Sequence, residues 1–205
     1  ELGAAVHGGE VDILVGTQML AKGHDFPNMT LALILDTDGA LYSPDFRATE
    51  RLFAQLMQVA GRAGRADKPG RVLIQTAFPD HPLFRYLQRH DFAGYARALL
   101  AERRQLDLPP FTRQILLRAE APTMEAALSY LQRAAALAPD TADVSVFSAT
   151  PAPMARVANL ERAQLLIQSA SRLALQAFVR DWRPRLDGIK PRVARWSLDV
   201  DPLVF

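Results

Sequence analysis

Two short apolar runs, each followed by polar residues, constrain the first half of this chain more than any other feature. They occupy residues 11–15, before Gly16, and residues 31–35, before Asp36. Apolar runs of this length between turn residues are typical of strands buried in a parallel sheet. The polar segment between them, residues 18–29, then lies at the carboxyl ends of these strands, which is the edge where open α/β sheets bind ligands.

A helix and a third strand continue this pattern. Leu52, Leu56 and Val59 recur at helical spacing, which predicts an amphipathic helix over residues 47–59. Residues 71–76 form a third strand-like run. The order of strand, loop, strand, helix, turn and strand predicts half of a parallel-sheet α/β domain.

A pair of prolines divides the chain. A further helix is expected over residues 91–106, and Pro109-Pro110 follows it. A residue before proline is biased toward extended backbone, so helices usually end there. We therefore expect one domain at residues 1–108 and a second at residues 109–205.

The second half restarts with its own pattern of strands and helices. Thr123 and Ser171 each stand where an N-cap begins a helix. The order β-α-β-β-α-β predicts the split βαβ fold, in which two helices cover one face of a four-stranded antiparallel sheet. The expected strands are residues 113–119, 144–148, 163–169 and 192–200, and the expected helices are residues 123–137 and 171–182.

Composition describes a globular protein and excludes several kinds of site. Hydrophobic residues make up 49% of the chain and charged residues 22%, so disorder is not expected. The chain has no cysteine, which excludes disulfides, thiolate zinc sites and thiol nucleophiles. No apolar run approaches the roughly 18 to 20 residues that span a bilayer, so we expect no membrane segment and a cytoplasmic location. The first residue is Glu1 rather than Met, which suggests a fragment of a longer protein.

The most specific string is Q-x-x-G-R-x-G-R at residues 58–65. It provides an amide, two glycines that permit close approach, and the guanidiniums of Arg62 and Arg65 about one helical turn apart. Arginines placed in this way can stabilise the charge on a transferring γ-phosphoryl group. Spacing alone is equally compatible with a solvated helix end.

A second string favours the phosphate interpretation. Residues 16–27 read G-T-Q-M-L-A-K-G-H-D-F-P, and with the first string they resemble motifs V and VI of superfamily 2 helicases. Further strings extend the resemblance over essentially the whole chain to the PriA family of bacterial replication-restart DNA helicases. The resemblance implies a partial RecA-like helicase lobe 2 followed by an S10-like C-terminal domain. These further strings are D-T-D-G-A at 36–40, D-F-R-A-T-E-R at 45–51, A-E-R-R at 101–104, L-P-P-F at 108–111 and W-S-L-D-V-D-P at 196–202.

The resemblance also implies roles for residues of the two motifs. Arg65 is the expected arginine finger, and Arg62 also faces the phosphates of ATP. A hydroxyl and nearby amides suit contact with a DNA backbone without reading its sequence. The remaining expected residues are Gly23, Asp25 and Gln58 toward the nucleotide, and Thr17 and Gln18 toward DNA.

The sequence lacks the other half of an ATPase site. It contains no G-x-x-x-x-G-K-[ST] loop and no D-E-x-H motif for Mg²⁺, so ATP and Mg²⁺ are expected to bind with lobe 1 of a longer parent. The family's zinc-binding cysteines are also absent, and zinc is not expected in this fragment. The resemblance implies an ATP-dependent 3′-to-5′ helicase that recognises stalled forks and single-stranded DNA. The alternative is an ATPase-deficient fork-binding scaffold that recruits single-stranded DNA-binding protein and primosome proteins.

One helix of the second half is a candidate partner site. The resemblance implies docking of the acidic, Phe-ending tail of single-stranded DNA-binding protein. Arg172 and Gln176 lie four residues apart, so they share a helix face and can hold a terminal carboxylate. We expect Leu173 and Phe178 to wall an apolar recess beside them. A solvated face of an amphipathic helix explains the same spacing equally well.

Several other residues favour ordinary structural roles. Asp36 and Asp38 are two apart with no further ligand cluster, so we expect hydrogen-bonding loop residues rather than a metal pair. The four histidines lie far apart in sequence, and no metal site is expected. Trp182 and Trp196 lie in a predicted helix and strand, where core packing is favoured over base stacking.

Overall fold

The computed structural model describes residues 11–16, 29–61, 63, 69–190 and 193–203. The chain divides into two compact units, Glu1–Leu99 and Leu100–Phe205, hereafter the first and the second unit. The division falls within α5 (Phe92–Gln105), and a domain boundary after Leu108 stays a prediction. In the part of the chain that is described, no helix is long and apolar enough to span a membrane.

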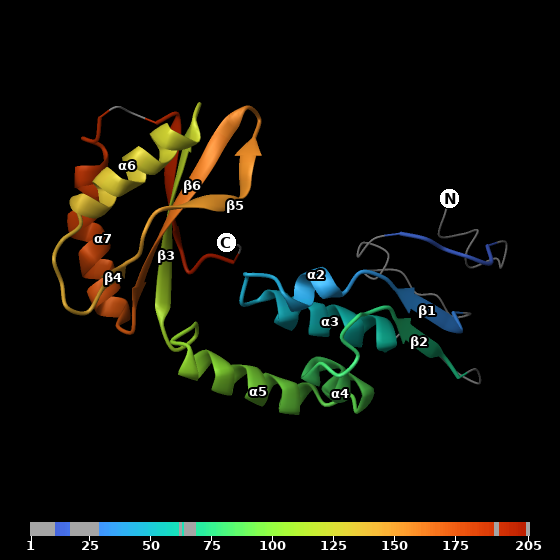
Figure 1. Cartoon of the computed structure of the whole chain (residues 1–205). Helices are drawn as coiled ribbons and strands as arrows, with labels where there is room; N and C mark the ends of the chain where they lie inside the picture. Colours follow the sequence, from blue (N-terminus) through green and yellow to red (C-terminus); the bar gives the residue numbers. More distant parts are fainter. Residues whose placement is uncertain (1–10, 17–28, 62, 64–68, 191–192, 204–205) are drawn as a thin grey trace. The chain divides into compact units, whose positions relative to one another are not determined.

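The first unit contains a two-stranded parallel sheet with helices packed against one side (Figure 1). The strands pair in register from Leu31↔Arg71 to Ile34↔Ile74. The sheet side that carries Ile34 and Ile74 packs on a core supplied mainly by the helices. The elements are β1 (Leu31–Ile34), α2 (Asp38–Leu41), α3 (Ala48–Ala60), β2 (Arg71–Ile74) and α4 (Pro82–Gln88).

Helical periodicity accounts for the core of this unit. Leu52 and Leu56 of α3 are buried as predicted, and Phe53 between them is also buried. The Phe53 ring lies 4.1 Å from the ring of Tyr95 in α5, measured between centroids. Helix α4, which the sequence pattern did not predict, begins with proline at its first turn and is capped by His81, whose Nδ1 accepts a hydrogen bond from the Leu83 N–H.

The strand predicted over residues 11–15 is wrong. Residues 11–16 adopt neither strand nor helix, and Ile13 and Val15 are 80% and 88% exposed. Among the described residues β1 pairs with β2 alone, so the segment has no sheet neighbour. Without a neighbour, an apolar run gains neither ladder hydrogen bonds nor a buried face.

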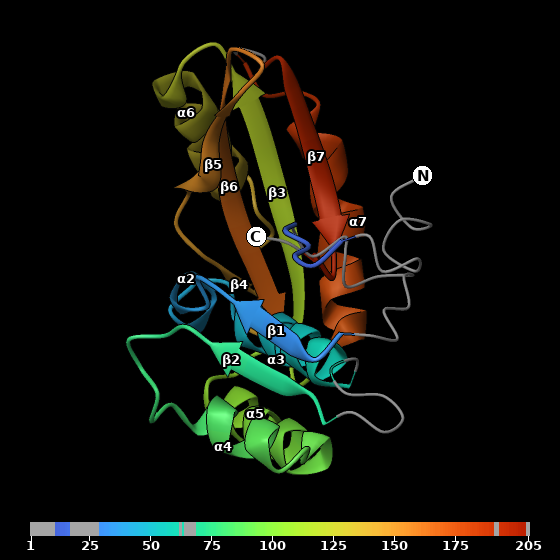
Figure 2. The same cartoon turned by 90° about the vertical axis from the view of Figure 1, so that its right-hand side faces the viewer.

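The second unit is an antiparallel sheet with two helices on one face (Figures 1 and 2). Strand β6 lies between β3 and the edge formed by β4 and β5, and β7 pairs with the other side of β3. This arrangement confirms the predicted α/β class and the split βαβ order. The elements are β3 (Arg113–Ala121), α6 (Met124–Ala136), β4 (Ser145–Val146), β5 (Thr150–Val157), β6 (Leu160–Ser169), α7 (Arg172–Leu186) and β7 (Arg195–Val200).

The edge strand of this sheet differs from the prediction. A single strand was expected over residues 144–148, but β4 and β5 both pair with β6, one after the other along the same edge. Pro151 and Pro153 argue against a strand in the sequence, because proline cannot donate to a ladder. The structure accommodates them on an edge with a register shift between Pro151 and Arg156.

The helices bury a continuous core against β3 and β6. Trp182 of α7 is fully buried, and its indole N–H donates to the Ala134 carbonyl at 2.9 Å. Trp196 of β7 is partly buried against the same core. Core packing of both tryptophans is therefore confirmed. Burial also raises the pKa of Tyr130 to about 12, and the charge of Asp187 adds to the rise.

Candidate functional site

A hydrogen-bonded clamp joins the chain segments that leave β1 and β2 at their carboxyl ends. The buried hydroxyl of Thr37 donates to the Gln75 carbonyl at 3.1 Å. The Asp38 carboxylate accepts from the Thr76 hydroxyl and from the Ala77 N–H, the latter at 2.9 Å. These two hydrogen bonds lower the pKa of Asp38 below its usual value. The hydrogen-bonding role expected for Asp38 is thus confirmed, although the residue begins helix α2 instead of lying in a loop.

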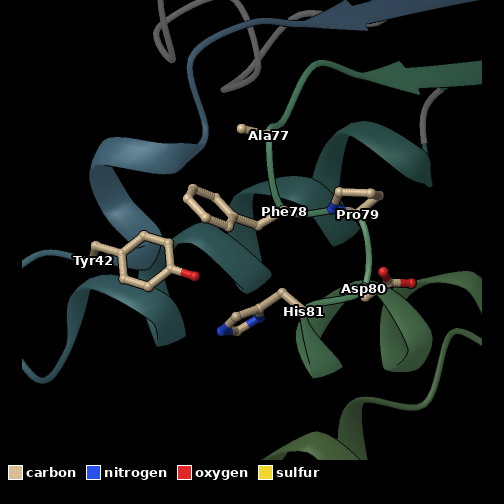
Figure 3. A pocket seen from close by; sticks show the side chains of 6 residues that line it. All are labelled: Tyr42, Ala77, Phe78, Pro79, Asp80 and His81. Carbon is tan, nitrogen blue, oxygen red and sulfur yellow. The ribbon is translucent and has the colours of Figure 1, made fainter.

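A pocket opens beside this clamp. Its volume is about 300 Å³, and Figure 3 shows the Tyr42 hydroxyl pointing toward the space between Phe78 and His81. The rings of Tyr42 and Phe78 meet edge to face, with centroids 4.6 Å apart. Sequence reasoning missed this site, although aromatic residues just beyond two strand-like runs were a usable signal. The lining residues are Tyr42, Ala77, Phe78, Pro79, Asp80 and His81.

Helix α3 leads into the arginine-containing string of motif VI. Gln58 lies exposed in its last turn, and the Gly61 N–H closes the helix by donating to the Met57 carbonyl at 2.9 Å. At the other end, the Asp45 carboxylate accepts from the Arg47 N–H at 2.9 Å and pairs with Arg51. Both ends of the helix are therefore fixed by local hydrogen bonds, and Gln58 is accessible.

The other site residues predicted in motifs V and VI lie outside the described residues. Gln58 is the member of the nucleotide-facing set whose position can be stated, and the roles of the others stay predictions. No group of three or more His, Cys, Asp or Glu that could hold a metal occurs among the described residues. The predicted residues outside the description are Thr17, Gln18, Gly23, Asp25, Arg62 and Arg65.

Helix α7 presents the predicted partner-binding pair. The Ser171 hydroxyl accepts from the Ala174 N–H at 3.2 Å, so the expected cap is confirmed. Arg172 and Gln176 are both exposed and lie one turn apart. Leu173 beside them is 77% exposed. This part of the α7 surface therefore carries two polar side chains and one exposed apolar side chain beside them.

Phe178 does not line this surface, and that part of the prediction is wrong. It is 2% exposed, and its ring centroid lies 5.2 Å from that of Trp182 inside the core. Leu175, Phe178 and Trp182 follow the i, i+3, i+7 spacing of the buried stripe. The spacing in the sequence contained this signal, which places Phe178 on a different side of α7 from Arg172.

An ion-pair network on the second sheet was not predicted. Glu120 lies 3.3 Å from Arg162 and 2.7 Å from Arg195, and Arg118 lies 2.7 Å from Asp199. Arg118 and Glu120 alternate along β3 with buried core residues, so their side chains lie on the face opposite α6 and α7. Cross-strand pairs of opposite charge support the register of three neighbouring strands.

Two family models match the chain. Residues 4–67 match the Helicase conserved C-terminal domain, and residues 104–203 match the Primosomal protein N C-terminal domain. With the parallel sheet of the first unit and the antiparallel sheet of the second, these matches define the class. The chain combines a RecA-like helicase lobe 2 with a primosomal C-terminal domain.

Curated relatives extend the match over most of the chain. The Replication restart protein PriA of Haemophilus influenzae is 43% identical over 196 residues, which cover 95% of this chain and 27% of that protein. The proteins of the same name from Synechocystis and Bacillus subtilis are each 37% identical, over 95% and 84% of this chain and 23% and 22% of their own lengths. The chain belongs to the PriA family, and it spans about a quarter of the length of these relatives.

Proposed function

We propose that this chain is the C-terminal part of an ATP-dependent 3′-to-5′ DNA helicase that restarts replication at stalled forks. The observation that carries the proposal is the joining, in one chain, of a helicase C-terminal match that contains motifs V and VI to a primosomal C-terminal match. Its proposed partners are fork and single-stranded DNA, single-stranded DNA-binding protein and other primosome proteins.

The chain's own residues fit one side of a nucleotide site. Gln58 is exposed at the end of α3, so its side-chain amide is accessible to a ligand. The guanidiniums of Arg62 and Arg65 have the charge and donor geometry that triphosphate oxygens require. ATP, with Mg²⁺, supplies the free energy of phosphoryl transfer when bound. Gly23 and Asp25 are the proposed nucleotide contacts of motif V, and Thr17 and Gln18 the proposed DNA contacts.

Substituting Arg65 tests this proposal in the complete protein that contains the chain. Arg65→Ala should lower kcat for DNA-stimulated ATP hydrolysis by about 10³-fold, because a finger acts mainly on transition-state charge. The KM for ATP should change modestly. Arg97→Ala, which removes an exposed arginine of α5, is the matched control and should leave kcat unchanged.

Two results would overturn parts of this proposal. An unchanged kcat in Arg65→Ala would remove Arg65 from the mechanism. A wild-type protein that binds forked DNA but hydrolyses no ATP would favour the fork-binding scaffold instead. Fork binding is measured with forked and linear duplexes at the same salt concentration, since phosphate contacts depend strongly on salt.

We further propose that α7 docks the tail of single-stranded DNA-binding protein. Arg172 and Gln176 are exposed one turn apart and Leu173 lies exposed beside them, which suits an acidic tail with a terminal carboxylate and an apolar last residue. Ser171 fixes the start of the helix. The proposed apolar contact for the terminal Phe is Leu173 and not Phe178.

Peptide titration tests the tail proposal. Arg172→Ala should weaken binding of a fluorescent tail peptide by about 10- to 150-fold, the equivalent of roughly 1.5 to 3 kcal/mol for a hydrogen bond to a charged group. Arg183→Ala removes an exposed arginine from the last turn of the same helix and should have little effect. Equal losses in both variants would indicate general charge attraction and would contradict a specific site at Arg172.

A further inference from the structure

Strand β7 forms an open edge of the second sheet. Among the described residues it pairs with β3 alone (Figure 2), in an uninterrupted register from Glu120↔Arg195 to Ile115↔Val200. The opposite edge is interrupted by Pro151 and by a register shift, whereas β7 contains no proline. An edge strand with a continuous register is a template on which a further extended chain can pair.

The backbone of β7 presents a regular row of donors and acceptors along this edge. The Asp201 N–H donates to the Gln114 carbonyl at 2.8 Å, and residues that bond to one neighbour alternate with outward-facing residues along an antiparallel strand. The odd-numbered residues of β7 therefore bond to β3, and the backbone groups of Trp196, Leu198 and Val200 face away from it. An extended polypeptide is the kind of ligand that offers partners at this spacing.

The side chains of β7 narrow the choice of polypeptide. Trp196 and Leu198 pack against the core that the helices cover. Arg195, Ser197 and Asp199 alternate with them and so lie on the other face of the sheet. That face carries a positive charge at the start of the strand and a negative charge near its end. A second strand of the same sequence, running antiparallel, therefore brings opposite charges together at both ends.

We propose that β7 pairs antiparallel with β7 of a second copy of this chain, about a two-fold axis at Ser197. In this register Arg195 lies opposite Asp199 of the second copy, and Trp196 exchanges both backbone hydrogen bonds with Leu198 of that copy. A shift by one residue would instead place the core-facing side chains of one copy on the polar face of the other. The pairing joins the two sheets into one, with the helices of both copies on the same side.

The charged side chains stay accessible for this pairing although each already has a partner. Arg195 donates from Nε and Nη2 to Oε2 of Glu120, and its side chain is 72% exposed. Asp199 accepts from Arg118 at Oδ2, and its side chain is 40% exposed. These bonds leave Nη1 of Arg195 and Oδ1 of Asp199 for the second copy. The dimer thus extends an existing network of alternating charge and breaks none of its ion pairs.

Sedimentation equilibrium of the 205-residue chain tests this inference. Strand β7 has 6 residues, fewer than the roughly 20 to 30 per side of a standard interface, so the dimer should be weak and its population should rise with protein concentration. Arg195→Asp and Asp199→Arg should each raise the dimer Kd at least about fivefold, because each replaces two attractive cross-strand pairs with two repulsive ones. Arg156→Asp is the matched control: it reverses a charge that pairs with Glu161 at the opposite edge, and should leave the Kd unchanged.

Mixing the two charge-reversed chains separates an interface from damage within one chain. In a mixed dimer each introduced charge meets an opposite charge on the other chain, so an equimolar mixture should associate with a Kd within about twofold of the wild-type value. Ion pairs lost to Glu120 or Arg118 inside one chain are not repaired by mixing. A mixture that stays monomeric, or single variants with an unchanged Kd, would overturn the proposal.

Amide hydrogen exchange followed by NMR provides an independent test. The Ser197 N–H bonds to β3 within each copy and should be protected at all concentrations, whereas the Leu198 N–H faces the open edge and should become protected only as the dimer forms. Protection of Leu198 in a monomeric sample would place another segment of the chain on this edge and would contradict the proposal. A chain that stays monomeric at every concentration would contradict it too. Neither result bears on the helicase proposal, which the kcat of Arg65→Ala tests.

Discussion

The two sheets of this protein are covered to different extents. In the second unit, Leu117, Leu165 and Ile167 are fully buried beneath α6 and α7. In the first unit, the side of the sheet away from the helices carries Leu31 and Leu33, which are 49% and 64% exposed. Antiparallel sheets commonly need only one covered face, whereas parallel sheets are usually covered on both. The second unit thus has the more complete core.

Because the two cores differ in this way, we expect substitutions to have different effects in the two units. The second unit is held by a core in which single residues have large effects on stability. The first unit contains Gln58 of motif VI, exposed in the last turn of α3, and we expect substitutions in this motif to change chemistry more than folding. Both tryptophans of the chain, Trp182 and Trp196, belong to the second unit, so tryptophan fluorescence reports on that unit alone.

The largest effect should come from the core of the second unit. Trp182→Ala removes a fully buried indole and its hydrogen bond to Ala134, and should lower the free energy of unfolding by about 3 to 5 kcal/mol. Urea titration followed by Trp196 fluorescence measures the loss. Leu173→Ala, at a position 77% exposed, is the control and should shift the midpoint little. A loss below about 1 kcal/mol would contradict the core described for this unit.

A matched pair of helix caps tests whether the units unfold separately. Asp91 accepts from the Gly94 N–H at 2.7 Å at the start of α5, and Ser171 caps α7. Each change to alanine should cost about 1 kcal/mol. Ser171→Ala should lower the fluorescence midpoint, while Asp91→Ala should instead speed hydrogen exchange in α3 and α4. If both variants shift the fluorescence midpoint equally, the two units unfold as one.

The smallest effect concerns the clamp of the first unit. The pKa of Asp38 is lower in the folded protein than its ordinary value of 3.8. Its ionised carboxylate therefore stabilises the fold when the pH is above 3.8, and this contribution is lost as the pH falls through the folded pKa. Asp38→Asn should therefore be less stable than wild type at about pH 6, with a difference that shrinks toward about pH 3. Hydrogen exchange of amides in β1 and β2 measures it. A difference that stays constant with pH would exclude this role for the carboxylate.

How much the sequence predicted depended on the kind of pattern. Helices with apolar residues at regular spacing, such as α3, α6 and α7, were predicted because that spacing is local. The strand at residues 11–15 was wrong because its stability depends on neighbours that periodicity does not specify. Strand β5 was missed because Pro151 and Pro153 exclude a central strand but not an edge strand.

For the candidate sites too, the predictions that depended on local spacing could be made from the sequence, and those that depended on distant segments could not. Exposure of Arg172 and Gln176 was predictable, since the buried stripe of α7 determines which face is left. The Phe178 prediction was wrong for the same reason, because that residue belongs to the stripe. The pocket was missed because Tyr42 and His81 come together only through the clamp between two separate segments. The roles of Arg62 and Arg65 depend on family resemblance and stay predictions.

The divided edge of the second sheet has a consequence for solubility. An exposed edge strand offers a row of N–H donors on which another chain can pair, and this is a route to aggregation. Pro151 and Pro153 remove two donors from β5, and the shift between Pro151 and Arg156 disrupts the row further. A neighbouring copy therefore finds no continuous row of donors along this edge, which disfavours pairing between the sheets of two molecules there.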